Sequence, residues 1–291
     1  MKPRWFIQDS LFASWRPDRE AINTQCLIFA IKELGLDVHV GKYIPFGGME
    51  YDFFEGDDPV IFYGSINLIL DFQRRKPKPW KPVAWFDEDA LSCHTYYTHL
   101  NKFILQQNHS FFRFGDLPGL KNHLFNNFAV DNKIFIRPDD NIKSFNGRII
   151  EQEYFDSWVS SPSHEDVSQD VIAVVSSPSE IEAEWRLIIA DGKVLTGSQY
   201  MNARCYEVKD GFPVKDMLKF MSEVEKEWKP HPIYCMDVCR LTTGEFRVVE
   251  IGSINCAGFH RCDLRSIVKI MSEIAMRECE KPISVRAWPH V

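Results

Sequence analysis

The chain has 291 residues, of which 45% are hydrophobic and 26% are charged, and its formal net charge is −7. This length allows two domains or one domain with a large core, and the composition is that of an ordinary water-soluble globular protein. The acidic balance argues against a broad nucleic-acid-binding surface but leaves room for a local basic pocket. The first residues lack the apolar stretch of a signal peptide, and no run is long enough to cross a bilayer, so we expect a cytoplasmic protein with no membrane contact.

The eight cysteines are spread along the chain, and several lie in apolar runs, where free cysteine behaves as a small hydrophobe. We expect no disulfides, because these form in oxidising compartments. Cys256, His260 and Cys262 suggest a zinc site only weakly, since no CxxC pair accompanies them.

The first part of the chain alternates predicted strands with predicted helices. Apolar runs predict strands at Arg4 to Gln8, Leu36 to Ile44 and Pro59 to Tyr63. Helical spacing of apolar residues predicts helices at Asp18 to Leu34 and Ile66 to Arg75. This order is typical of a small parallel α/β unit. After a connector with three prolines, we predict a strand at Ala84 to Asp87 and a helix at His94 to Gln107.

A second unit is predicted to begin near Asn127. Its predicted strands are Lys133 to Arg137, Val171 to Ser176, Glu184 to Ile189 and Val194 to Tyr200, and its predicted helices are Phe212 to Trp228 and Asp263 to Arg277. Asp191-Gly192 is a strong hairpin turn between the third and fourth of these strands. The stretches from Asp139 to Gly147 and from Ser160 to Asp170 are polar and are predicted to be loops.

The sequence from Ile233 to Cys256 predicts a long β-hairpin that carries two carboxylates, Asp237 and Glu250, in otherwise apolar strands. Burying a carboxylate is costly unless it is paired or binds a metal. If the register brings both side chains onto one face, they form an oxygen-rich site of the kind that Mg²⁺ takes when it also binds nucleotide phosphates. The alternative is a solvent-facing sheet edge.

Three earlier stretches carry further candidate residues. Arg137 ends a predicted strand, where a planar guanidinium can reach phosphate oxygens, and the loop that carries Lys143 and Gly147 follows it. This loop is no Walker A motif, because GxxxxGK[ST] occurs nowhere in the chain. Glu184 and Arg186 share one strand face by alternation. The alternative for these charges is a solvated turn or an ordinary ion pair.

Taken together, these motifs resemble the ATP-grasp superfamily, in particular the clade named for two arginines and one lysine. Four stretches carry the resemblance: FIRPDDNIKSFNG, VIAVVSSP, EWRLIIADGKVLTGSQY and the carboxylate hairpin. They run from about Ile134 to His260, and VIFYGS, Val60 to Ser65, is similar to the domain that precedes the ATP-grasp domain in that clade. The resemblance implies an α+β ATP-grasp fold of two subdomains that grip ATP, preceded by a small parallel α/β pre-ATP-grasp domain. The implied boundaries are residues 1–126 for the first domain, 127–178 for a lid subdomain and 179–291 for a metal-binding subdomain.

The resemblance also implies the ligands of ATP and Mg²⁺. The metal ligands are Asp237, Glu250 and a third residue. The family has an asparagine two positions after the glutamate, but Gly252 stands there in this chain, so Ser253 or Asn255 substitutes for it, with Asn255 preferred for its amide oxygen.

Arg137 and Lys143 are implied to hold phosphates. Arg186 is implied to stabilise the transferring phosphoryl group, with Lys143 as the second catalytic residue. Glu184 either orients Arg186 or acts near the metal, and backbone groups of Val175, Ser176 and Ser177 are implied to read the adenine edge.

The implied activity is that of an ATP-dependent carboxylate–amine ligase. A substrate carboxylate attacks the γ-phosphoryl group to give an acyl phosphate, and an amine then attacks that intermediate to give an amide or peptide, while a lid around Lys143 excludes water. The substrates are expected to be small molecules or peptides, and a homodimer is a common default. A phosphotransferase and a catalytically inactive nucleotide-binding module remain alternatives, the latter because of the missing asparagine.

Overall fold

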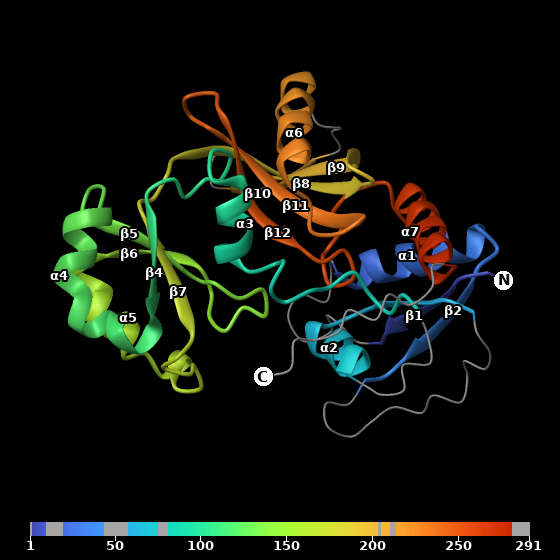
Figure 1. Cartoon of the computed structure of the whole chain (residues 1–291), viewed down its shortest axis with the longest axis horizontal. Helices are drawn as coiled ribbons and strands as arrows, with labels where there is room; N and C mark the ends of the chain where they lie inside the picture. The colour runs from blue at the N-terminus through green and yellow to red at the C-terminus, as the bar shows by residue number, and fades with distance from the viewer. Residues whose placement is uncertain are drawn as a thin grey trace. The chain divides into compact units, whose positions relative to one another are not determined.

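The computed structural model describes residues 2–9, 20–43, 58–74, 81–202, 205–209 and 214–280, which form two compact units (Figure 1). Residues 1–85, 254–259 and 263–291 belong to unit 1, and residues 86–253 and 260–262 to unit 2. None of the helices in the described ranges is long and apolar enough to span a membrane.

Unit 1 contains the three-stranded parallel sheet that the sequence predicted. Its strand order is β2-β1-β3, with β1 at Arg4–Gln8, β2 at Asp37–Gly41 and β3 at Val60–Tyr63. The helices are α1 (Glu20–Glu33), α2 (Ile66–Arg74) and α7 (Leu264–Cys279). The central strand is buried on both faces, as expected of a covered parallel sheet. The C-terminal helix α7, which we had assigned to the second domain, packs against α1 in this unit.

A four-stranded antiparallel sheet forms one part of unit 2. Its order is β4-β7-β5-β6, with β4 at His109–Arg113, β5 at Lys133–Pro138, β6 at Arg148–Glu151 and β7 at Ile172–Ser176. Two helices, α4 (Leu117–Phe128) and α5 (Phe155–Val159), pack on it around a core that includes Phe125, Phe155 and Trp158. Short 3-10 turns lie at Phe114–Asp116, Gln152–Tyr154 and Pro162–His164.

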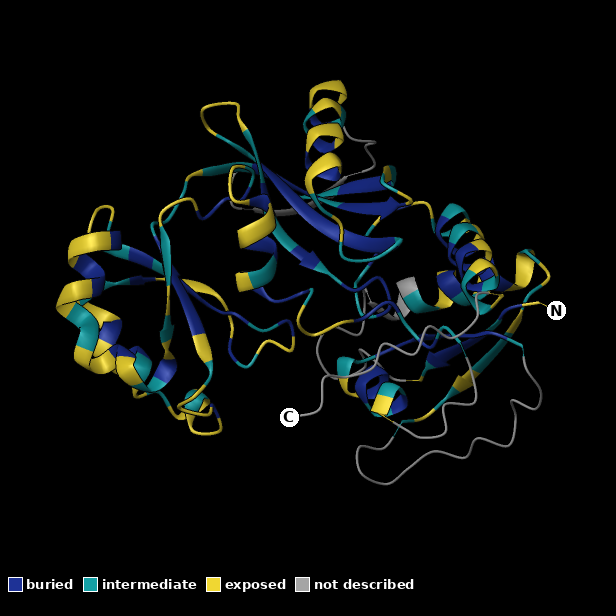
Figure 2. Ribbon diagram, viewed as in Figure 1, coloured by how far each residue is buried: buried dark blue, intermediate teal, exposed yellow. Residues whose placement is uncertain are grey.

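A five-stranded antiparallel sheet forms the other part of unit 2, in the order β10-β9-β8-β11-β12. The strands are β8 (Ile181–Ala190), β9 (Lys193–Asn202), β10 (Cys205–Lys209), β11 (Ile233–Leu241) and β12 (Phe246–Gly252). Two further helices are α3 (Cys93–Leu100) and α6 (Lys215–Glu227). The β8–β9 turn is as predicted, since Asp191 and Gly192 both have positive φ, of 47° and 78°. The middle strands of this sheet are among the most buried parts of the unit (Figure 2).

Some predicted elements differ from the structure. No strand forms at Ala84 to Asp87, and the helix predicted over His94 to Gln107 ends at Leu100. Between Leu100 and strand β4, the chain forms a single β-bridge, from Ile104 to Val248 of β12. Pairing with a distant strand therefore takes the place of the predicted helix in this stretch. The sequence does not predict strand β4 or helix α4, because the apolar residues of that region have no clean period. Pro118 lies in the first turn of α4, where proline is common.

Candidate functional site

A row of four side chains crosses the five-stranded sheet on one face. In the register, Ser198 of β9 lies opposite Arg186 of β8, Arg186 lies opposite Asp237 of β11, and Asp237 lies opposite Glu250 of β12. Directly opposed residues in antiparallel strands project from the same face. The two carboxylates therefore meet the condition that the sequence left open.

Arg186 and Asp237 form a two-pronged ion pair. The Nε and Nη2 atoms of Arg186 donate to the two carboxylate oxygens of Asp237, each at 2.8 Å. Only 8% of the Asp237 side chain and 20% of the Arg186 side chain are exposed. Burial alone would lower the pKa of Arg186, but Asp237 raises that pKa well above its ordinary value. The guanidinium is thus permanently charged and fixed in orientation.

Glu184 and Tyr200 flank this pair. The Tyr200 hydroxyl donates to the Glu184 carboxylate and lies 3.4 Å from Oδ2 of Asp237. Burial raises the pKa of Glu184 above its ordinary value, although the bond from Tyr200 works in the other direction. Glu184 is therefore linked through Tyr200 to the Asp237 side of the row, and its role in orienting Arg186 or in acting near the metal stays a prediction.

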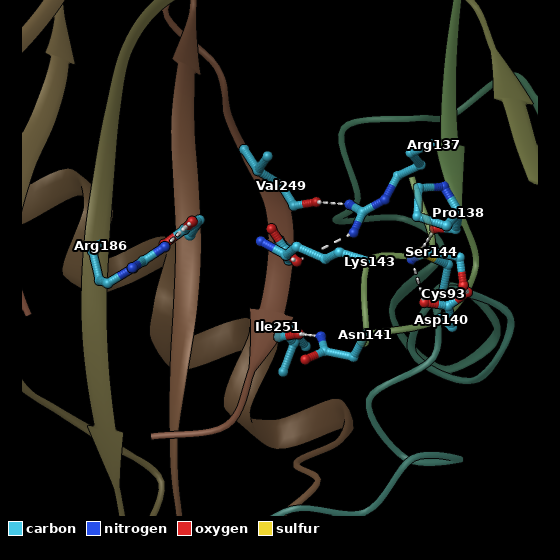
Figure 3. Close-up of polar contacts among 12 residues, drawn as sticks. Cys93, Arg137, Pro138, Asp140, Asn141, Lys143, Ser144, Arg186, Val249 and Ile251 are labelled. Atoms are coloured by element: carbon cyan, nitrogen blue, oxygen red, sulfur yellow. Dashed lines mark hydrogen bonds and ion pairs between the residues drawn. The ribbon is translucent and has the colours of Figure 1, made fainter. Parts of the chain in front are cut away.

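Glu250 is paired with cations from the four-stranded sheet. Nη2 of Arg137 lies 3.3 Å from its Oε1, and Nζ of Lys143 lies 3.6 Å from the same atom. Burial would raise the pKa of Glu250, but Arg137, Lys143 and Arg186 outweigh burial and hold it below the ordinary value. Figure 3 shows Arg137 and Lys143 reaching toward β12 from the side of the four-stranded sheet, while Arg186 extends from β8 toward the neighbouring strand β11.

The local backbone explains how Arg137 reaches this place. It stands at the end of β5, and its Nη1 also donates to the carbonyl oxygen of Val249 at 3.3 Å. Gly147 passes so close that an added Cβ would lie 3.1 Å from the Cβ of Arg137 and 3.3 Å from the ring of Phe135. A side chain at residue 147 would press on Arg137, which accounts for the glycine in the predicted motif.

The segment after the hairpin returns to the same row. His260 has a left-handed φ of 50°, and its ring stacks on Tyr200 with the centroids 5.1 Å apart. The backbone N–H of Arg261 donates to the Ser198 hydroxyl at 3.3 Å. Burial, helped by Arg186, lowers the pKa of His260 to about 4, so the imidazole is neutral at physiological pH.

The residues predicted to read adenine lie at the end of β7. Val175 and Ser176 pair with β4 on one side and β5 on the other, and the N–H of Ser177 donates to the Asn108 carbonyl at 3.1 Å. The backbone N–H of Ser177 is therefore already used. The Ser176 hydroxyl, however, is fully buried and has no hydrogen-bond partner among the described residues. The assignment of Val175, Ser176 and Ser177 to the adenine edge stays a prediction.

Asn255 lies in unit 1, where its side chain is fully buried. Its Oδ1 accepts from the N–H of Trp85 at 2.9 Å, and its Nδ2 donates to the carbonyl of Phe62 at 2.6 Å. Both ends of the amide thus tie the segment after β12 to the backbone of unit 1. Its assignment as a third metal ligand stays a prediction.

The side chains of the row and its partners can be tested for how well they fit a metal ion. Within the described ranges, no group of three or more His, Cys, Asp or Glu side chains could hold a metal alone. Asp237 and Glu250 supply two adjacent carboxylates, and Arg137, Lys143 and Arg186 surround them with three cations. Mg²⁺ that binds with a nucleotide needs only one or two carboxylates, since phosphates complete its shell. The arrangement fits a metal–nucleotide complex better than a lone ion.

Comparison with known proteins identifies the family of the chain. The family model described as ATP-grasp domain, R2K clade family 2, matches residues 121–270, more than half of the chain. No curated protein matches the sequence.

Solved structures match along almost the whole chain. D-cycloserine synthetase DcsG is 12% identical with a TM-score of 0.62, and the match covers 94% of this chain and 99% of that one. D-alanyl-alanine synthetase A from Vibrio cholerae O1 biovar eltor is 10% identical with a TM-score of 0.62, covering 96% and 98%. The ATP-grasp ligase PsnB with its minimal precursor, Mg and ADP is 10% identical with a TM-score of 0.54, covering 95% and 98%. The predicted ATP-grasp fold is confirmed.

Proposed function

The chain belongs to the R2K clade of ATP-grasp domains, and from this premise we propose that it is an ATP-dependent ligase that joins a carboxylate to an amine. One observation carries the proposal: the row Arg186–Asp237–Glu250, with Arg137 and Lys143 closing over its end. Structurally similar proteins include two synthetases of small molecules and a ligase that acts on a precursor peptide. We therefore propose that the substrates are small molecules or peptides.

The chain's own residues divide the work of phosphoryl transfer. Arg137 and Lys143 would bind phosphate oxygens, and Arg186 would neutralise charge that develops on the transferring group. Asp237 and Glu250 would hold Mg²⁺, which when bound neutralises and orients the phosphates. The Ser176 hydroxyl lies where we propose adenine binds. The Tyr200 hydroxyl, which donates to Glu184, lies 3.4 Å from Oδ2 of Asp237 and would help to position this carboxylate.

The reaction then has two steps. A substrate carboxylate oxygen attacks the γ-phosphorus, the bond to the β-phosphate oxygen breaks, and ADP leaves an acyl phosphate behind. The amine nitrogen next attacks the acyl carbon, the bond from carbon to the phosphate oxygen breaks, and a proton leaves the nitrogen as phosphate departs. Positioning and charge neutralisation supply the catalysis in both steps.

The two rival functions share this site. A phosphotransferase would stop at the phosphorylated acceptor, and an inactive module would bind ATP without turnover. Gly252, in place of the usual asparagine, favours the module. Retention of the full cation set argues against it, because a simple binder does not need a buried arginine aimed at the transferring phosphate.

An ADP-release assay with pooled carboxylates and amines tests the proposal. We expect ADP and phosphate in equal amounts, and only when both substrate classes are present. ADP release that needs one acceptor and leaves no free phosphate would identify a phosphotransferase. Binding of ATP without turnover in any pool would identify the inactive module.

A further inference from the structure

The loop between β5 and β6 carries Lys143 at its tip and follows directly on Arg137. Lys143 has a left-handed φ of 60°, and 58% of its side chain is exposed, yet its Nζ lies 3.6 Å from Glu250. An exposed lysine ordinarily samples many rotamers and contributes little to a surface ion pair. What holds the loop in place therefore decides whether Lys143 meets Glu250 beside Arg137, and we call the two cations, Arg137 and Lys143, the phosphate clamp.

Asp139 fixes the first half of the loop to helix α3. Its two carboxylate oxygens accept from the backbone N–H and from Nδ1 of His94, each at 2.7 Å, and its own carbonyl accepts from the N–H of Cys93 at 2.9 Å. Ser92 occupies the N-cap of α3, but its side chain makes no capping bond. A carboxylate at a helix N-terminus satisfies free N–H groups and interacts favourably with the helix dipole. Asp139 is 8% exposed, so this contact is shielded from solvent.

Asn141, two residues before Lys143, fixes the loop to β12. Its side chain is 9% exposed, and its Nδ2 donates to the carbonyl of Ile251 at 3.0 Å. Arg137 donates in the same way to the carbonyl of Val249. These two carbonyls flank Glu250, so Arg137 at the end of β5 and Asn141 in the loop contact β12 on the two sides of this residue (Figure 3).

An irregularity in β12 makes this grip possible. Asp237 pairs with Glu250 and Val238 pairs with Val248, so Val249 is an extra residue without a partner in β11. A bulge of this kind turns backbone groups away from the regular ladder and is common beside active sites. Because β12 is the edge strand of the sheet, the redirected carbonyls are accessible to side chains of the loop.

We propose that Asp139 and Asn141 are positioning residues, which hold Arg137 and Lys143 opposite Glu250 before the nucleotide binds. This inference rests on the proposed function, because it assigns the held cations to phosphates. The loop is thus fixed before its tip by Asp139 and Asn141, and Asp140 spans the tip by accepting from the N–H of Ser144, at 3.2 Å, and from the Ser144 hydroxyl, at 2.7 Å. Pre-positioning of this kind reduces the entropy lost when the triphosphate binds.

The test compares a nucleotide that the clamp touches with one that it does not. We would measure the affinity of the full-length protein for Mg·AMPPNP and for AMP, which lacks the outer phosphates. Asn141→Asp keeps the shape of the side chain but has no proton to donate, and Asn141→Ala and Asp139→Ala remove the contacts. Asp139→Asn is the conservative variant, since its amide oxygen can still accept from the His94 N–H. Lys121→Ala breaks an exposed ion pair with Asp156 elsewhere in unit 2 and is the control.

We expect the Asn141 variants and Asp139→Ala to bind Mg·AMPPNP about 10-fold or more weakly, with AMP affinity within about 2-fold of the starting protein. Amide exchange of residues 139–147 should accelerate in the same variants, while Asp139→Asn and Lys121→Ala stay near the starting values. If the ratio of the AMPPNP affinity to the AMP affinity stays unchanged, whether because neither nucleotide or both nucleotides lose affinity, the inference about Asp139 and Asn141 is wrong. The proposed function would not be affected by that result. A starting protein that binds neither nucleotide would overturn the proposed function itself, even if the exchange pattern held.

Discussion

The guanidinium of Arg186 donates to both carboxylate oxygens of Asp237, at 2.8 Å each. On the neighbouring strand β12, Glu250 forms ion pairs with Arg137 and Lys143. Each carboxylate proposed to bind Mg²⁺ is thus already neutralised by cations proposed to bind phosphate. The cations and the carboxylates are expected to exchange partners when a metal–nucleotide complex arrives.

This pairing predicts that the metal binds only together with the nucleotide. Mn²⁺ serves as a spectroscopic substitute for Mg²⁺. Without a nucleotide, Mn²⁺ would have to displace two arginines from the carboxylates, and no phosphate would be present to pair with them. Buried arginines left unpaired are costly. We expect Mn²⁺ titrated alone to give no tight site by electron paramagnetic resonance, and one to two ions to bind after AMPPNP is added. Tight binding of Mn²⁺ to the nucleotide-free protein would contradict the prediction.

Arg186→Lys should damage turnover far more than folding. Lysine keeps the charge but cannot make two parallel bonds to Asp237, so the position of the charge is lost. We expect the rate of ADP formation to fall by about 100-fold or more, with a small change in melting temperature. The matched control is Arg240→Lys on the same sheet, because Arg240 makes an equivalent two-pronged pair with Glu182, at 2.9 and 2.8 Å, outside the row. Equal losses in both variants would show that the effect is not specific to the site.

Ser176→Ala separates ligand binding from stability. The hydroxyl is buried and has no described partner, so its removal should leave the free protein equally stable or more stable by up to about 1 kcal/mol. If the hydroxyl meets the adenine, affinity for AMPPNP should fall by about 5-fold to 10-fold. Thermal unfolding with and without AMPPNP measures both effects. A variant that is destabilised without ligand, or that binds normally, would remove Ser176 from the adenine site.

The buried carboxyl of Glu225 leads us to expect a pH-dependent effect on stability, at a position outside the candidate site. Burial raises the pKa of this α6 carboxyl, the Tyr234 hydroxyl donates to one oxygen, and the other oxygen has no partner among the described residues. An acid whose folded pKa lies above its unfolded value weakens the fold at neutral pH, and this penalty disappears as the pH falls through the folded pKa toward the unfolded one. Glu225→Gln should therefore stabilise the protein by about 1 kcal/mol at pH 7 and have almost no effect near pH 4.

The control for this prediction lies on the same helix. Glu223 is exposed and bonded to Lys226, so Glu223→Gln removes a carboxylate without relieving any burial. Urea unfolding of both variants between pH 4 and pH 8 measures the difference. Stabilisation by Glu225→Gln that grows as the pH falls would have the wrong sign and would contradict the account.

The sequence predicted the parts of the site that depend on local pattern. Alternation in two strands, with a turn between them, placed Asp237 and Glu250 on candidate faces, and the structure confirms the shared face. Glu184 and Arg186 share a strand face for the same reason. Strands β1 and β3 of unit 1 were predicted because buried parallel strands are short continuous apolar runs.

The parts that the sequence did not predict depend on contacts between distant segments. Nothing near Asn141 indicates that its amide meets the carbonyl of Ile251, 110 positions away. The bulge at Val249 leaves no local signal, because valine suits a regular strand equally well. Likewise, the sequence around Asp139 predicts only a loop, because nothing local indicates that the N-terminus of α3 lies beside it. Long-range pairing, rather than propensity, decides these positions.

The most direct test of the central claim is a crystal structure of the protein with AMPPNP and Mn²⁺, in which anomalous scattering locates the metal. The account predicts a Mn²⁺ peak bound by carboxylate oxygens of Asp237 and Glu250 and by phosphate oxygens, with Arg137, Lys143 and Arg186 in contact with the triphosphate. A metal that touches neither carboxylate, or a triphosphate that lies away from these three cations, would contradict it.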